Sequence, residues 1–241
     1  MTETVAPYLG AFLIGLSKAG LATGLGMLTT PLVASAMPAR AAIGVVLPLL
    51  CCADAMTIAL YWKKWSVALV RWPLAGALLG ILVGMLFVGS VSERGLRIAI
   101  GTVGLAMTGL LLIRNRFGSE RAYAPPWWHG LLVGVAAGFA STIAHAAGPI
   151  IAIYFLAQKP DKLSFVASTA LFFTVNNLLK LPPYLAADLI NEATLRADLR
   201  YLPAIPLGVA AGWLVNRLIP QGAFDGIVYA LLVLTSLQLL F

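Results

Sequence analysis

The chain has 241 residues, of which 61% are hydrophobic and only 10% are charged, and its mean hydropathy is +0.94. So little polar surface excludes a soluble globular protein and predicts a membrane protein. The net charge of +7 comes from 16 Lys and Arg residues scattered in ones and twos along short loops, a pattern typical of topology signals that excludes a nucleic-acid-binding stripe.

The chain is predicted to be all-α and polytopic, with about eight transmembrane segments. A bilayer core of about 30 Å needs about 20 apolar residues per helix. Apolar segments lie at 8–36, 41–62, 65–91, 96–113, 127–156, 163–185, 201–219 and 224–241. The N-terminus "MTETVAPYLG" lacks the basic region of a signal peptide, so we expect the first segment to stay in the mature protein.

The first segment is too long for one straight helix, so it is predicted to be tilted, broken or re-entrant. Its stretch "GLATGLGMLTTP" carries Gly20, Gly24, Gly26 and Pro31 as predicted helix breakers. Freed backbone groups are tolerated at membrane depth only inside protein or beside a water-filled cavity. Close helix packing is the alternative explanation for the glycines.

Two ionisable residues lie deep in the first two segments. Lys18 is interpreted either as an anion contact beside a broken helix or as a snorkelling or paired lysine. Asp54 would oppose an anion, so it is expected to pair with Lys18 or to carry a coupled proton. The adjacent Cys51 and Cys52 are expected to be small core residues, since the spacing fits neither a disulfide nor a metal site.

The segments fall into two sets of four, which predicts an internal duplication. The first repeat is placed at 1–115, a polar linker at 116–126 and the second repeat at 127–241. Aligning Pro31 with Pro149 places Gly20 on Gly138. In the second half the predicted break lies in "GFASTIAHAAGP", with Gly138, Gly148 and Pro149 as the breakers.

Polar residues are denser in the second half. Ser141, Thr142 and His145 lie in or beside the predicted break, where His145 is either a ligand or a hydrogen-bonded core residue. Asn176 and Lys180 share a helix face next to Asn177. Pro182 and Pro183 are expected to end that helix, which would leave Lys180 near an interface.

The topology depends on whether each half makes four or five crossings. With four, the loops at 63–71, 114–129 and 186–200 share a side, and their basic residues place both termini in the cytoplasm. If the first element of each half is a hairpin, each half makes five crossings and the repeats are inverted. No paired carboxylates, nucleotide-binding loop or metal-ligand spacing occurs in the sequence, so we expect no enzyme, metal or cofactor.

Four stretches resemble the sulfite exporter TauE/SafE family of bacterial membrane transporters. They are "GLSKAGLATGLGMLTTPLVA", "GVVLPLLCCADAMTIALYWKKW", "GFASTIAHAAGPIIAIYFLAQK" and "FVASTALFFTVNNLLKLPPYL", of which the last is the most specific. The resemblance implies a two-repeat helical transporter of the bacterial inner membrane that exports sulfite, sulfoacetate or a related organosulfonate. His145 departs from the amide or small residue expected there.

The resulting hypothesis is a gradient-driven exporter with alternating access around a midplane site. Its expected partners are a small anion, the lipid bilayer and a coupling proton or ion. The chain is expected to act either alone or as a homodimer. The alternatives are an importer or channel for another inorganic anion and a non-transporting scaffold subunit. The predicted substrate-binding residues are Lys18, Thr23, Thr29, Thr30, Ser141, Thr142, His145, Asn176, Asn177 and Lys180.

Overall fold

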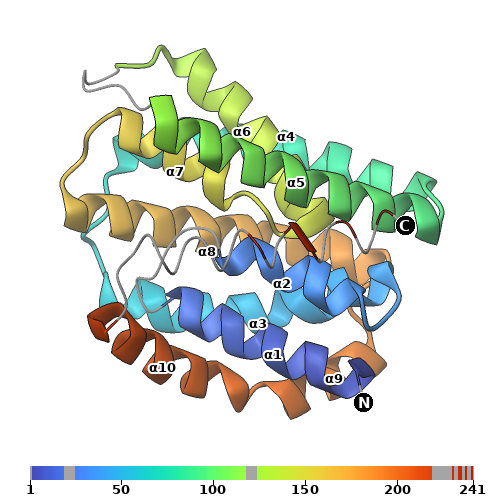
Figure 1. Cartoon of the computed structure of the whole chain (residues 1–241). Coiled ribbons are helices and arrows are strands. Elements are labelled where there is room, and N and C mark those ends of the chain that lie inside the picture. The colour runs from blue at the N-terminus through green and yellow to red at the C-terminus, as the bar shows by residue number, and fades with distance from the viewer. Residues whose placement is uncertain are drawn as a thin grey trace.

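A computed structural model describes residues 2–18, 25–117 and 124–218, together with residues 230, 233, 234, 237 and 240. These residues are helical, without strands, which confirms the predicted all-α class. The helices are α1 (Thr2–Lys18), α2 (Leu25–Ala34), α3 (Ala39–Leu60), α4 (Val67–Ser90), α5 (Glu93–Phe117), α6 (Trp127–Ala144), α7 (Gly148–Ala157), α8 (Lys162–Ala186), α9 (Glu192–Tyr201) and α10 (Ala204–Leu218). Most of the long helices lie side by side in one bundle (Figure 1).

The first element is a helical hairpin, in which α2 folds back along α1. A Cβ added at Gly10 of α1 would lie 2.7 Å from Val33 Cγ2, and one added at Gly26 would lie 3.5 Å from Ser17 Oγ. Gly26 and Pro31 lie inside α2 and do not interrupt a helix, contrary to the prediction. The predicted breakers Gly20 and Gly24, like Thr23, lie outside the described residues.

The second element is also a hairpin, formed by α6 and α7. The Tyr154 hydroxyl of α7 lies 2.7 Å from a Cβ added at Gly130 of α6. Residues 145–147 form the turn, and His145 adopts the left-handed conformation with φ 52°. Gly138 lies inside α6, so it does not break the helix as predicted, whereas Gly148 and Pro149 begin α7.

Two pairs of parallel helices meet through glycines, and each pair joins the two halves of the chain. α4 packs along α6, and α1 packs along α10. A Cβ would lie 2.0–2.3 Å from a backbone oxygen of the neighbouring helix at six positions: Gly76 (Leu131 O), Gly80 (Val135 O), Gly134 (Pro73 O), Gly138 (Ala77 O), Gly15 (Ile205 O) and Gly208 (Phe12 O). Gly138 therefore serves close helix packing, which explains why it continues the helix.

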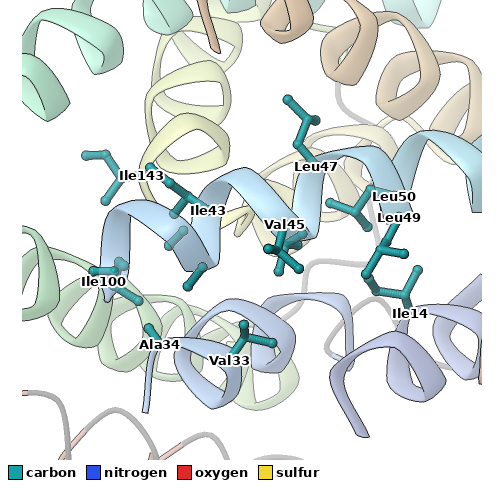
Figure 2. Close-up of a cluster of buried hydrophobic side chains, with 14 of the residues drawn as sticks. Ile14, Val33, Ala34, Ile43, Val45, Leu47, Leu49, Leu50, Ile100 and Ile143 are labelled. Carbon is teal, nitrogen blue, oxygen red and sulfur yellow. The ribbon is translucent and has the colours of Figure 1, made fainter. Parts of the chain in front are cut away.

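The large apolar core forms around α3. Figure 2 shows Ile43, Val45 and Leu47 along this helix, with Val33 of α2 on one side and Ile143 of α6 on another. These side chains are almost completely buried. α3 therefore packs against both hairpins, and this packing fixes the position of its polar residue, Asp54, within the bundle.

Four of the described helices are long and apolar enough to cross a membrane: α3, α4, α6 and α8. α1 contains a shorter apolar stretch, Val5–Lys18. These helices support a membrane protein, while the predicted number of eight segments stays a prediction. α8 continues through Pro182 and Pro183 to Ala186, so the prolines do not end it where predicted.

The long polar loop predicted after the sixth segment contains a helix, α9. Asn191 caps it, and a capping box joins Asn191 to Thr194. The preceding loop lies beside the start of α3, since a Cβ at Gly44 would meet Leu189 O. The loop before α4 lies instead beside the start of α8, where the Ser66 N–H donates to Ser168 Oγ at 2.9 Å. These two loops therefore lie at opposite ends of α3, which contradicts the common side expected for four crossings in each half.

Candidate functional site

Three helices bring a buried charged cluster together. Lys18, the last residue of α1, pairs with Oδ1 of Asp54 on α3. The other carboxylate oxygen accepts a hydrogen bond of 2.6 Å from the Asn177 Nδ2 of α8. Asp54 is only 1% exposed, so this pairing compensates a carboxylate that would otherwise be costly to bury. The Lys18 ammonium also lies 5.2 Å from the centre of the Phe173 ring.

Lys180 lies on the same helix as Asn177 and is completely buried, at 0% exposure. Its Nζ donates to the Ser141 backbone oxygen at 3.2 Å and to Ser141 Oγ at 2.9 Å. In the described part of the chain, no carboxylate forms an ion pair with it. α8 continues past the two prolines and keeps Lys180 inside the bundle, while the suggested position near an interface stays a prediction.

Ser141 links Lys180 to Asn176. Its hydroxyl oxygen accepts a hydrogen bond of 2.8 Å from Asn176 Nδ2 as well as the one from Lys180. Asn176 Oδ1 is buried and has no hydrogen-bond partner among the described residues. Buried side-chain oxygens are normally satisfied, so this atom is available for a ligand that donates a hydrogen bond.

The two hairpins meet at His145. Its Nδ1 lies 3.2 Å from Thr30 Oγ1 of α2. The left-handed backbone at His145 is stabilised because its N–H bonds to Ser141 O and the next N–H bonds to Ala140 O. A non-glycine residue in this conformation carries strain, which the surrounding contacts must offset.

Two buried polar atoms of the hairpins, His145 Nε2 and Thr29 Oγ1, have no hydrogen-bond partner among the described residues. Thr29 and Thr30 are both 0% exposed on α2, and the methyl group of Thr29 lies 3.4 Å from a Cβ added at Gly10 of α1. A hydroxyl or an imidazole N–H can donate a hydrogen bond to an anion, whereas the amide oxygen of Asn176 can only accept one.

Thr142 and Tyr184 have structural positions beside this cluster. The Thr142 hydroxyl donates to Gly138 O at 2.8 Å within α6, so it is not free to bind a ligand. The Tyr184 hydroxyl donates to Thr142 O at 2.6 Å, and thereby satisfies a carbonyl near the end of α6. Sequence reasoning missed Tyr184, although its position four residues after Lys180 places it on the same helix face.

Seven of the ten predicted binding residues, together with Asp54, fall into three groups. Lys18, Asp54 and Asn177 form one cluster, Ser141, Asn176 and Lys180 form a second, and Thr30 and His145 form the contact between the hairpins. The hydrogen bonds and the ion pair described above hold these side chains in their positions. Among the described residues, no group of three or more His, Cys, Asp or Glu residues could hold a metal ion.

The model of the sulfite exporter TauE/SafE family matches residues 8–239, nearly the whole chain. The chain belongs to this family. The match confirms the resemblance carried by the four sequence stretches. It includes both hairpins and all three polar groups, so the site described above lies within the family's shared region. No curated protein and no solved structure matches the chain.

Membership of the TauE/SafE family identifies a membrane transporter family rather than an enzyme family. The four apolar helices that could cross a membrane agree with it. The residues inside those helices that can bind a solute are therefore candidates for a transport pathway. A polar residue at membrane depth is costly and is usually kept for such a function.

Proposed function

We propose that this protein is a secondary transporter of the bacterial inner membrane that exports a sulfur-containing anion such as sulfite, sulfoacetate or a related organosulfonate. The family match supports the class of solute. The buried polar groups between the hairpins support the position of the binding site. Transport is driven by a gradient, with the site reached alternately from the two sides of the membrane.

Lys180 is the observation that carries the proposal. Its ammonium is fully buried and donates only to Ser141, without an ion pair in the described residues. A buried lysine is favoured in its charged form only beside a counter-charge, and a bound anion supplies one. An ammonium has three N–H donors, of which two are used by Ser141, so one remains for the anion. Lys18, in contrast, already has a counter-charge in Asp54.

We infer that the two halves are inverted repeats. The ten-residue helices α2 and α7 begin 123 residues apart, at Leu25 and Gly148, and α3 and α8 begin the same distance apart. This separation differs from the 118 predicted from the prolines, since Pro31 lies in the middle of α2 and Pro149 in the first turn of α7. A hairpin followed by three helices gives each half an odd number of passes. Inverted repeats of this kind suit alternating access.

The separation also relates two residues of the site. Asp54 and Asn177 are 123 residues apart and hydrogen-bond to each other between α3 and α8. Gly15 and Gly138 of the helix pairs are also 123 residues apart, whereas Gly80 and Gly208 are 128 residues apart. The site thus lies where equivalent residues of the two repeats meet, which is where transporters of this design bind their solute.

Uptake and exchange in proteoliposomes test the function. Purified protein is assayed with radiolabelled sulfite, sulfoacetate, taurine, thiosulfate and sulfate. We expect the protein to accelerate the exchange of sulfite or an organosulfonate. A scaffold subunit would not accelerate exchange. A channel would conduct the anion, but anion on the opposite side of the membrane would not stimulate its flux. Lys180→Met should reduce exchange at least tenfold, and it should weaken binding by about 1 to 3 kcal/mol because a charge-assisted contact is lost.

The exposed Lys64 provides the matched control. Lys64→Met removes the same charge outside the site, so it should exchange the anion at the parental rate. Parental exchange by a correctly folded Lys180→Met variant would mean that the anion binds elsewhere. If the parent exchanges none of the five solutes, the proposed substrate class is wrong.

A further inference from the structure

Outside the anion site, α9 carries a buried carboxylate, that of Asp198. The side chain is 7% exposed, and neither carboxylate oxygen has a hydrogen-bond partner among the described residues. The ion pairs formed by the described residues do not include it. A buried charge without a partner is unfavourable, so the carboxyl group holds a proton when it is enclosed in this way.

The orientation of α9 makes this arrangement unusual. Asp198 faces inward with Thr194, Ala197 and Tyr201, while Leu199 next to it is 71% exposed. A helix that packs on an apolar core normally places leucine inside and the carboxylate outside. The reversed arrangement leaves the carboxyl group against α3 and α1, the two helices that pack on α9.

Two groups that can titrate interact with Asp198, Cys52 from α3 and Tyr201 of α9 itself. Tyr201 in turn interacts with Tyr8 of α1 and with Arg200. Burial raises the pKa of Asp198 to about 8. Its proton therefore exchanges at the pH values found on the two sides of a bacterial inner membrane.

We propose that Asp198 is the proton-binding site that couples anion transport to a proton gradient. Asp54 was the sequence-based candidate for this role, but it is already paired with Lys18 and Asn177. α3 connects the two sites, since Cys52 of this helix lies near Asp198 and Asp54 follows two residues later. Gain or loss of the proton changes the charge of the Asp198 side chain, which packs against α3. It therefore changes the free energy with which α9 packs on α3. The inference rests on the proposed transport function.

The test separates exchange from proton-driven accumulation. Asp198→Asn keeps the shape of the side chain in a form that cannot ionise. We expect it to exchange radiolabelled sulfite or sulfoacetate across the membrane at a rate within about twofold of the parent. With a pH difference imposed across the liposome membrane, the parent should accumulate the anion and the variant should accumulate at least tenfold less.

Two further variants serve as controls. Glu192→Gln changes an exposed carboxylate at the start of the same helix and should leave both activities unchanged. Asp198→Glu retains a titratable group and should retain part of the proton-driven accumulation. Infrared spectroscopy provides a readout independent of transport, because a protonated carboxyl band that titrates near pH 8 should be present in the parent and absent in Asp198→Asn.

Each contrary outcome identifies what is wrong. Parental proton-driven accumulation by Asp198→Asn overturns the inference and leaves the proposed function intact. Loss of exchange together with accumulation, in a folded variant, also overturns it, because Asp198 would then be required for translocation itself. If the parent exchanges no anion, the proposed function fails and the coupling inference fails with it. An infrared band that is unaffected by Asp198→Asn overturns the inference alone, because Asp198 would then not hold the proton.

Discussion

At the scale of single residues, the most important finding is that the two intramembrane lysines differ. Both are predicted anion contacts, yet Lys18 is neutralised by Asp54, whereas Lys180 hydrogen-bonds to Ser141, lies 6.0 Å from the centre of the Tyr184 ring and has no carboxylate partner in the described chain. The two residue types are identical, so the difference comes entirely from their neighbours. A buried lysine with a carboxylate partner already has its counter-charge, and one without it can receive a counter-charge from a ligand.

A double-mutant cycle tests the Lys18–Asp54 pair. Asp54→Asn and Lys18→Met each leave one buried charge without its partner, and each should destabilise the protein by about 3 to 5 kcal/mol. The double variant should lose clearly less than the sum of the two. Unfolding of the purified proteins in detergent measures these free energies, and strictly additive losses would contradict the pairing.

The stability of the protein should also depend on Asp198. Its pKa is about 8 in the folded protein and about 4 in an unfolded chain, so between these pH values the folded state binds more protons. The contribution of Asp198 to stability should therefore be fully present below about pH 4 and be lost as the pH rises through about 8. Thermal unfolding from pH 5 to 8 should show a shallower decline for Asp198→Asn; an unchanged slope would refute the assignment.

At the scale of helices, glycines decide which elements touch. A Cβ on Gly80 would lie 2.1 Å from Val135 O, whereas one on Gly89 of the same helix has nothing within 4 Å. The same residue type is therefore essential at one position and replaceable at the other. Sequence alone shows both glycines in α4 and does not distinguish them.

Gly80→Ala and Gly89→Ala form a matched pair. Gly80→Ala should separate α4 from α6 and cost about 1 to 3 kcal/mol, as overpacking typically does. Gly89→Ala should be neutral or stabilise α4 by up to about 1 kcal/mol, since alanine favours helix. Thermal unfolding in detergent compares them, and equal melting temperatures would show that the close approach is not needed.

At the scale of the whole molecule, the hairpins determine which loops share a membrane face. Lys63 and Lys64 lie in the loop beside the start of α8, and Lys159 lies just before that helix. The loop that contains Asp188 lies beside the start of α3. Because basic residues favour the cytoplasm, the lysine-rich face is expected inside and the Asp188 loop outside.

Labelling of single cysteines tests this orientation. In a background with Cys51 and Cys52 replaced by alanine, Asp188→Cys should react with a membrane-impermeant maleimide in intact cells. Lys63→Cys should react only after the membrane is opened. The reverse pattern would invert the orientation, and labelling of both in intact cells would contradict the separation of the two loops.

The sequence by itself determined the membrane class, the helical fold and the family, since these depend on hydropathy, segment length and local motifs. It also identified Lys18, Asp54, Asn176, Asn177 and Lys180, because a polar residue in an apolar segment is visible without a structure. Only the tertiary structure decided which lysine is paired, that Pro31 and Gly138 continue their helices, and that Asp198 faces inward. Those outcomes depend on contacts between residues far apart in the chain, such as Lys18 with Asp54 and Gly138 with Ala77, and no local pattern encodes the partner.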